Sequence, residues 1–344
     1  MRIGLVGYQG SGKTTLFEWL TGVAADPAQT HGGQSAMATV PDPRVERLVA
    51  VYRPKKVTLA ALELVDTPGL SRTHEGNAQR LGILRDTGCL VLVVAGFAGG
   101  DPATDLRAFD EDLMLADMEI VAGRIERVEQ SLKKPLPRQE HQQLEHELAT
   151  LRVVLGAIES GKPLAEVHLT DEQRKVLRAF RLFSEKPRMV IVNTADDDSQ
   201  PERFTALSTD RVPVLAVPAG LERELARLSP EDRAEFESGL GVRGTDHDAV
   251  LRAMLNVSGQ ITFYTCGDRE VRTWLLRRGG TALEAAGNIH TDLARGFIRA
   301  EVIHVDDLLR LGSEREVKAH GLMRQEPKDY VITEDDIVLI RFSV

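Results

Sequence analysis

The sequence predicts an α/β domain with a doubly wound, mostly parallel sheet, an inserted helical hairpin and a separate α+β domain. The first observation is a set of short apolar strand candidates, each bounded by turn residues or charge, at residues 2–6, 57–65, 89–95, 188–192 and 212–217. Such strands alternating with helices are typical of a parallel sheet covered on both faces. The second observation is a purely helical pattern over 109–185, and the third is a group of short strand candidates after residue 259.

These patterns predict three parts. We expect the α/β domain at 1–108 plus 186–258, the antiparallel hairpin at 109–185 and the C-terminal domain at 259–344. In the hairpin, two stretches carry apolar residues at helical spacing: Met114, Val121, Ile125, Val128 and Leu132, then Leu144, Leu148, Leu151, Leu155 and Ile158. We interpret these stripes as hairpin core, with a partner-docking solvent face as the alternative. The C-terminal strand candidates are 261–265, 271–276, 297–304, 330–332 and 337–342, and a helix is expected at 282–290.

Composition limits the class of protein. The chain has 344 residues, more than one compact core usually holds. A net charge of −9 argues against wholesale coating of nucleic acid, and two cysteines are too few for a disulfide framework or a zinc site. No run approaches the roughly 18 apolar residues of a membrane span. The N-terminus is too soon interrupted by glycine to be a signal peptide, so we expect a cytoplasmic protein without a membrane partner.

A phosphate-binding motif opens the chain. Residues 7–14 read GYQGSGKT, which fits G-x-x-x-x-G-K-[ST] between a strand and a helix. Backbone N–H groups of such a loop face the phosphates, the lysine reaches the β- and γ-phosphates and the final hydroxyl ligates Mg²⁺. We therefore assign nucleotide binding to Gly7, Gly10, Ser11, Gly12, Lys13, Thr14 and Thr15.

A second motif, Asp66-Thr67-Pro68-Gly69, lies about fifty residues after the first, directly behind an apolar strand. We expect the Asp66 carboxylate to hold the magnesium shell and the Gly69 N–H to contact the γ-phosphate. A threonine between the two motifs should sense the γ-phosphate through magnesium, and Thr30 and Thr39 are both candidates. Leu70 follows where many GTPases place a water-orienting glutamine, and a leucine cannot orient water.

The base would be read after the strand at 188–192, where Asn193-Thr194-Ala195-Asp196 stands in place of N-K-x-D. Asn193 can bond the purine edge and brace the loop, and Asp196 can accept the N–H donors of guanine. Thr194 replaces the lysine that packs over the base. A solvated acidic loop that continues into Asp197 is the alternative.

Nearly the whole chain resembles the YchF / Obg-like ATPase family. The most specific segments are 270–274, 288–292, 296–303 and 328–330, which are similar to that family's TGS domain, together with 41–44 and 230–236. The resemblance implies a β-grasp shape for the C-terminal domain, a cytosolic magnesium-dependent triphosphatase, ribosome association and contact with RNA. It also selects Thr30 as the switch threonine, so that Thr14, Thr30 and Asp66 would hold magnesium, and Lys13, Thr30, Asp66 and Gly69 would serve catalysis.

The sequence departs from the family pattern at several positions. Gln9, Gly10 and Ser11 stand where the family carries Pro, Asn and Val, and Asp196 stands for the family's glutamate. The last change reopens guanine as the base, so the substrate is ATP or GTP. We interpret the chain as a divergent paralogue and expect a monomeric, slow nucleotide switch that acts with the ribosome or RNA. The alternatives are a non-hydrolysing nucleotide-binding adaptor and a P-loop small-molecule kinase.

Overall fold

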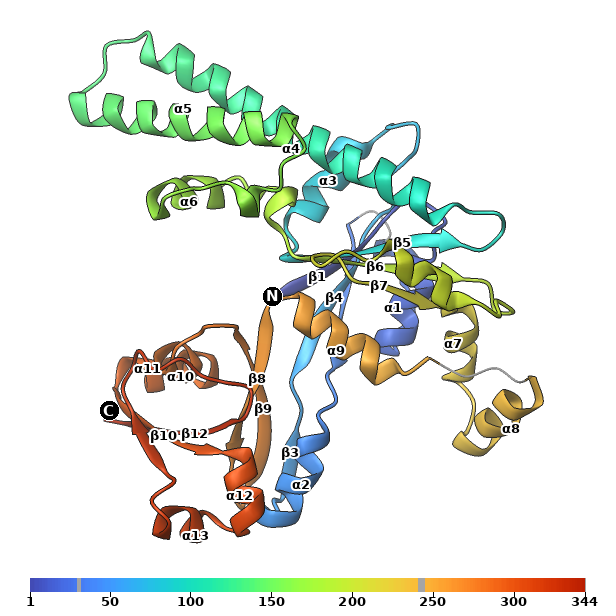
Figure 1. The fold of residues 1–344 in the computed structure, drawn as a ribbon, viewed down its shortest axis with the longest axis vertical. Coiled ribbons are helices and arrows are strands. Elements are labelled where there is room, and N and C mark those ends of the chain that lie inside the picture. Colours follow the sequence, from blue (N-terminus) through green and yellow to red (C-terminus); the bar gives the residue numbers. More distant parts are fainter. Residues whose placement is uncertain (30–31, 241–244, 344) are drawn as a thin grey trace. The chain divides into compact units, whose positions relative to one another are not determined.

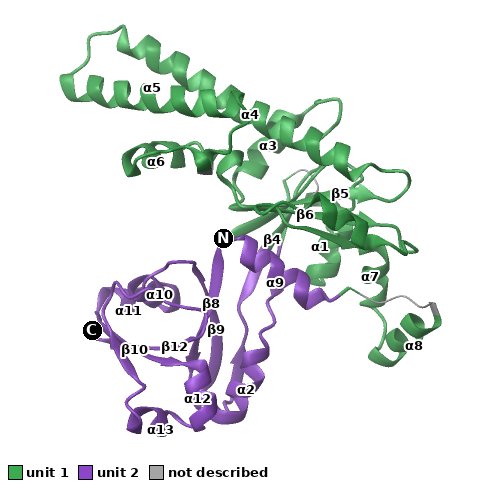
Figure 2. Cartoon of the chain, viewed as in Figure 1, with its two compact units in different colours: residues 1–35, 64–245 green, residues 36–63, 246–344 purple. Residues whose placement is uncertain are grey.

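The computed structural model describes residues 1–29, 32–240 and 245–343. The chain forms two compact units (Figure 2): unit 1 comprises Met1–Ser35 and Leu64–Thr245, and unit 2 comprises Ala36–Glu63 and Asp246–Val344. Within the described ranges, no helix combines the length and the apolar character that crossing a membrane requires.

One six-stranded sheet has the order β2-β4-β1-β5-β6-β7 (Figure 1); β1, β5, β6 and β7 belong to unit 1, whereas β2 and β4 continue past its bounds into residues of unit 2. Its strands are β1 (Arg2–Val6), β2 (Gln34–Thr39), β4 (Ala61–Asp66), β5 (Cys89–Gly96), β6 (Arg188–Thr194) and β7 (Val214–Val217). The pairs β1–β5, β5–β6 and β6–β7 are parallel. The predicted parallel α/β sheet is therefore confirmed, and parallel strands bring their carboxyl ends to one edge, where such sheets bind ligands.

The helices of unit 1 lie between these strands or follow β7. They are α1 (Lys13–Thr21), α3 (Asn77–Arg85), α4 (Pro102–Leu132), α5 (Arg138–Glu159), α6 (Asp171–Arg178), α7 (Ala219–Leu225) and α8 (Pro230–Leu240). Helices α1 and α7 pack against each other, and α4 packs against β5.

The inserted helical hairpin consists of α4 and α5 (Figure 1). Helix α4 begins at Pro102, where the Asp101 carboxylate accepts from the backbone N–H groups of Ala103 and Thr104. Part of each apolar stripe meets in one cluster, in which Val121 and Leu151 are fully buried. Their predicted role as hairpin core agrees with this burial.

Unit 2 contains a second six-stranded sheet, in the order β11-β10-β12-β8-β9-β3. Its strands are β3 (Lys56–Thr58), β8 (Gln260–Cys266), β9 (Glu270–Arg277), β10 (Phe297–His304), β11 (Arg324–Glu326) and β12 (Asp336–Phe342). Its helices are α2 (Pro43–Tyr52), α9 (His247–Val257), α10 (Ala282–Ile289), α11 (Thr291–Arg295), α12 (Val305–Leu311) and α13 (Glu314–Ala319). The predicted α+β character of the C-terminal domain is confirmed. The strand expected at 330–332 is wrong, because there only Val331 forms an isolated bridge with Thr281.

The apolar run 57–65, predicted as one strand, is divided between the two sheets. Strand β3 pairs in parallel with β9 in unit 2, whereas β4 lies between β2 and β1 in the other six-stranded sheet. Between them the Ala60 N–H donates to Thr273 Oγ1 at 2.6 Å. Residues 36–63 and 246–258, which the sequence places in the α/β domain, therefore belong to unit 2 in the structure.

Candidate nucleotide-binding site

The glycine-rich loop joins β1 to α1, and its glycines are required by space and by backbone conformation. Gly12 has φ +94°, and a Cβ there would lie 2.1 Å from Asn193 Nδ2. At Gly7, with φ +142°, a Cβ would lie 2.3 Å from the Val93 carbonyl oxygen. Helix α1 begins at Lys13 without a side-chain cap. Its first N–H groups are therefore available to an anion.

Lys13 is a buried cation without a carboxylate hydrogen-bonded to it among the described residues. Its side chain is 6% exposed, and Nζ donates to the Tyr8 carbonyl oxygen at 2.7 Å. Burial lowers the pKa of Lys13 to about 8, although the nearby Asp66 carboxylate opposes that shift. A buried charge is costly unless it is paired. The arrangement therefore favours binding of an anion next to Nζ.

Thr14 and Asp66 lie beside this lysine. Thr14 Oγ1 donates to Asp66 Oδ2 at 2.7 Å. Burial raises the pKa of Asp66, against the effects of Thr14 and Lys13. Asp66 Oδ1 is buried and has no hydrogen-bond partner within the described part of the chain, and Ser11 Oγ is in the same situation.

These oxygens fit a divalent cation, because magnesium binds hard oxygen ligands and usually one or two carboxylates together with phosphates. No group of three or more His, Cys, Asp or Glu residues suited to a metal occurs within residues 1–29, 32–240 and 245–343. A magnesium ion at this place would therefore need the Thr14 hydroxyl and phosphate oxygens in addition to Asp66.

The segment after Asp66 is joined to the glycine-rich loop by backbone hydrogen bonds. The Gln9 N–H donates to the Leu70 carbonyl, and the Leu70 N–H donates to the Gly7 carbonyl, each at 3.0 Å. A Cβ at Gly69 would lie 2.8 Å from Lys13 Nζ. Gly69 thus lies next to the lysine, as its predicted role requires.

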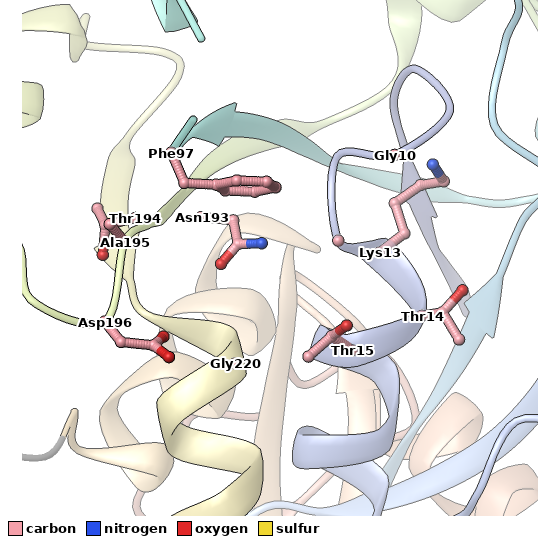
Figure 3. Close-up of a pocket in the computed structure, with 11 residues that line it drawn as sticks. Gly10, Lys13, Thr14, Thr15, Phe97, Asn193, Thr194, Ala195, Asp196 and Gly220 are labelled. Carbon is pink, nitrogen blue, oxygen red and sulfur yellow. The ribbon is translucent and has the colours of Figure 1, made fainter. Parts of the chain in front are cut away.

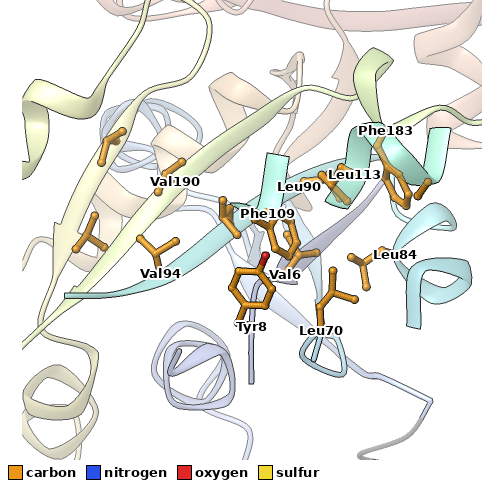
Figure 4. Packing of buried hydrophobic residues seen from close by; sticks show 14 residues of the cluster. Val6, Tyr8, Leu70, Leu84, Leu90, Val94, Phe109, Leu113, Phe183 and Val190 are labelled. Atoms are coloured by element: carbon orange, nitrogen blue, oxygen red, sulfur yellow. The ribbon is translucent and has the colours of Figure 1, made fainter. Parts of the chain in front are cut away.

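Leu70 explains how this segment is held. Its side chain is fully buried in a cluster with Tyr8, Leu84 and Phe109 (Figure 4). The position where many GTPases place a water-orienting glutamine is therefore part of the hydrophobic core.

Two cavities meet at Lys13. One, of about 550 Å³, is lined by Gly10, Gly12, Lys13, Thr14, Thr15, Phe97, Asn193, Thr194, Ala195, Asp196 and Gly220. The other, of about 490 Å³, shares Gly10, Lys13 and Thr14 with the first and adds Asp66, Gly69 and Arg80 among its lining residues. The structure thus gathers most of the predicted site residues around two adjoining cavities, a base-side cavity and a switch-side cavity. Gly7 and Ser11 stay in the loop outside both linings, although the Ser11 carbonyl accepts from Asn193 Nδ2 at 3.2 Å.

Asn193, which lines the base-side cavity, joins two backbone segments by hydrogen bonds. Its Nδ2 donates to the Ser11 carbonyl oxygen at 3.2 Å, and its Oδ1 accepts from the Ala219 N–H at 3.0 Å. Asp196 Oδ1 accepts from the Leu221 N–H at 3.0 Å. Asn193 therefore braces the glycine-rich loop against the start of α7, and Asp196 retains its second oxygen for another donor.

Phe97 is a lining residue that the sequence reasoning missed. Figure 3 shows its ring on the same side of the cavity as Asn193 and Asp196, with Lys13 and Thr14 on the other side. The signal was present in the sequence, since Phe97 directly follows β5 at the sheet edge that carries Gly7 and Asn193.

The two candidate switch threonines are Thr30 and Thr39, and a histidine, His74, follows Leu70. Thr30 lies outside the described residues, so its predicted magnesium role stays a prediction. Thr39 is an exposed residue of β2 and lines neither cavity. His74, with φ +60°, lies on the exposed segment after Leu70 with Nδ1 3.4 Å from Asp112 Oδ1.

Comparison with known proteins identifies relatives along the whole chain. A family model described as 50S ribosome-binding GTPase matches residues 2–122, and the YchF GTPase C-terminal model, described as a protein of unknown function (DUF933), matches 260–343. The chain is 32% identical to the ribosome-binding ATPase YchF of Bacillus subtilis, over 99% of each chain. It is also 32% identical to the rice (Oryza sativa subsp. japonica) Obg-like ATPase 1, over all of this chain and 92% of that protein.

The fold agrees with these relatives. The solved structure of the Schizosaccharomyces pombe YchF GTPase matches 99% of this chain and 97% of its own with a TM-score of 0.84 at 24% identity. The predicted fold class is confirmed by that match. With full-length relatives above 30% identity and a matching C-terminal model, this chain belongs to the YchF family.

Proposed function

We propose that this protein is a magnesium-dependent purine nucleoside triphosphatase that acts as a slow nucleotide switch. The observation that carries the proposal is the buried Lys13 ammonium, bonded to a carbonyl and lying beside a carboxylate oxygen without a hydrogen-bond partner. A bound triphosphate with its magnesium would supply the anion to the first and the cation to the second.

Different residues would bind the phosphates and the magnesium ion. Lys13 and the loop N–H groups would bind the β- and γ-phosphates, and Gly69 would contact the γ-phosphate. Magnesium, held by Thr14, Asp66 and Thr30 directly or through water, would neutralise phosphate charge. Since Thr30 lies outside the described residues, its part rests on the sequence pattern.

At the other end, the Phe97 ring would pack on the purine and Asp196 would bond its edge. Asn193 would act mainly by holding the loop that binds the phosphates, since its amide is already bonded at both ends. Aspartate suits the N–H donors of guanine. The names of the family relatives, which call them ATPases, favour adenine as the base. Both ATP and GTP are therefore substrates to test.

Slow turnover follows from Leu70, because an aliphatic side chain buried in the core cannot orient the attacking water. The same observation favours a second candidate, a nucleotide-binding adaptor that does not hydrolyse its ligand. The names of the relatives place them on ribosomes, so we propose a ribosomal partner and a cytoplasmic location for this chain as well. The hairpin and the C-terminal domain would be the surfaces that meet ribosome or RNA.

A titration with fluorescent ATP and GTP analogues, with and without magnesium, tests the site, and phosphate release at saturating nucleotide tests hydrolysis. We expect magnesium to tighten binding to the wild-type protein and not to the Asp66→Asn variant, which keeps the shape of the side chain and removes its charge. Binding to both proteins in EDTA serves as the control. Binding without phosphate release would select the adaptor, and absence of binding would sink the proposal.

A further inference from the structure

The switch-side cavity carries a second cation with no assigned role. Of the charged residues that line this cavity, Lys13 and Arg80 are positive and Asp26 and Asp66 are negative. Phosphoryl transfer develops negative charge on the γ-phosphate oxygens, and many nucleotide hydrolases neutralise it with an arginine supplied by the same chain or by a partner. Leu70 supplies no polar group, so another residue of this chain would have to neutralise this charge.

Arg80 differs from its neighbouring arginines in having no carboxylate partner among the described residues. Arg72 makes a bidentate ion pair with Asp105 at 2.7 and 2.8 Å. Arg85 pairs with the fully buried Asp117 at 2.9 Å. Arg80 only donates to the Glu75 carbonyl at 3.3 Å and to Asn77 Oδ1 at 3.4 Å. These long bonds to neutral oxygens are weak, so the guanidinium can exchange them for a phosphate.

The backbone that carries Arg80 is fixed to the segment that follows Gly69. Asn77, the first residue of α3, accepts from the Ser71 N–H at 2.8 Å and donates to the Ser71 carbonyl at 2.9 Å. Asn77 is 6% exposed, and these two bonds are partly shielded from water. Arg80 follows one helical turn later. The backbone at Arg80 is therefore fixed relative to the segment after Gly69, the residue that would contact the γ-phosphate.

We propose that Arg80 is an intramolecular arginine finger for the triphosphatase reaction, a catalytic residue that contacts the transferred phosphoryl group in the transition state. This inference rests on the proposed function. The water oxygen forms the new bond to the γ-phosphorus, and the bond to the bridging oxygen breaks with its electron pair leaving on the nucleoside diphosphate. The proton of the water ends on the released phosphate or in solvent. Arg80 stays protonated throughout and contributes charge and hydrogen bonds to the phosphoryl oxygens, not a proton.

The test compares Arg80→Ala and Arg80→Lys with the wild-type protein in single-turnover phosphate release, together with triphosphate affinity. We expect Arg80→Ala to lower the rate by about 10³-fold while the Kd for the triphosphate changes little. Arg80→Lys should recover part of the rate, because an ammonium supplies charge without the planar fork. The variant Gln79→Ala, an exposed neighbour on the same helix, controls for disturbance of α3 and should match wild type.

A second readout is formation of the complex with nucleoside diphosphate and aluminium fluoride, which mimics the transferred phosphoryl group. Wild type and Gln79→Ala should form it, and Arg80→Ala should not. Hydrolysis by Arg80→Ala at the wild-type rate would overturn the role of Arg80 and leave the proposed function standing. A loss of rate matched by an equal loss of triphosphate affinity would overturn it too, by assigning Arg80 to ground-state binding. If wild type binds nucleotide and releases no phosphate, both proposals fall.

Discussion

The phosphate end and the base end of the site differ in whether their polar groups are satisfied by the protein itself. At the phosphate end, Lys13 is bonded to a carbonyl, and Asp66 Oδ1 and Ser11 Oγ have no hydrogen-bond partner in the described ranges. At the base end, both atoms of the Asn193 amide are bonded to backbone, and one oxygen of Asp196 is too.

This difference indicates where binding energy would come from. Buried polar groups without partners cost free energy that a complementary ligand removes, whereas satisfied groups must exchange one bond for another and gain little. We therefore expect the triphosphate and its magnesium to dominate affinity, and the base to contribute mainly through packing on Phe97. The order of the following effects would reverse if the base end dominated.

The largest effect is expected from Lys13→Ala. Hydrogen bonds to charged groups contribute about 1.5–3 kcal/mol each, so loss of the bonds to two phosphates should weaken triphosphate binding by about 100-fold or more. Calorimetric titration measures this. The matched control is Lys186→Ala, since burial also lowers the pKa of Lys186 to about 8 and the side chain lines neither cavity of the site. Unchanged affinity in Lys13→Ala would contradict the assignment of the phosphate end.

A smaller effect is expected from Phe97→Ala. Stacking of a base on an aromatic side chain contributes about 1–3 kcal/mol, and ATP and GTP should lose affinity equally because every purine presents a stacking face. Phe236→Ala, which changes a phenylalanine of α8 that is 41% exposed, should bind like wild type in the same titration. A loss larger than that of Lys13→Ala would mean that the base end dominates.

The smallest effect concerns pH. Because burial lowers the pKa of Lys13 to about 8, the ammonium that binds phosphate is mostly present at pH 7 and must increasingly be regained by proton uptake as the pH rises past 8. Triphosphate affinity should therefore fall by about tenfold between pH 7 and pH 9. Titrations at fixed free magnesium check this, and Lys13→Ala should lack that part of the pH dependence. The same depressed pKa makes the nucleotide-free protein gain stability from about pH 8 to 10.5, since only the unfolded state binds the proton there.

Much of the fold could be predicted because short apolar runs record burial directly. The strands at 2–6 and 297–304 agree with β1 and β10 residue for residue. The division of the run 57–65 into two strands could not be predicted, because apolar character does not indicate which strand a segment pairs with. Its division between β3 and β4 depends on β9 and Thr273, more than 200 residues further along the chain.

The candidate site divides in the same way. The glycine-rich loop and the Asp66 motif could be found from the sequence, because each is a local run of residues whose backbone and charge must act together. Arg80 could not, because it belongs to no local motif and reaches its cavity through the packing of α3, and Phe97 was marked only by its position directly after a strand.

By itself, the sequence determined the local chemistry of this protein: glycines that let the loop turn, a lysine and a hydroxyl at a helix N-terminus, and a carboxylate at the end of a strand. Only the tertiary structure decided which of those groups remain available. Asn193 is hydrogen-bonded to the loop, and Leu70 is packed in the hydrophobic core. Within the described residues, Lys13, Asp66 and Arg80 can still bind a ligand. The physical reason is that hydrogen-bond partners and burial depend on residues that are distant in the chain and meet only in the folded state.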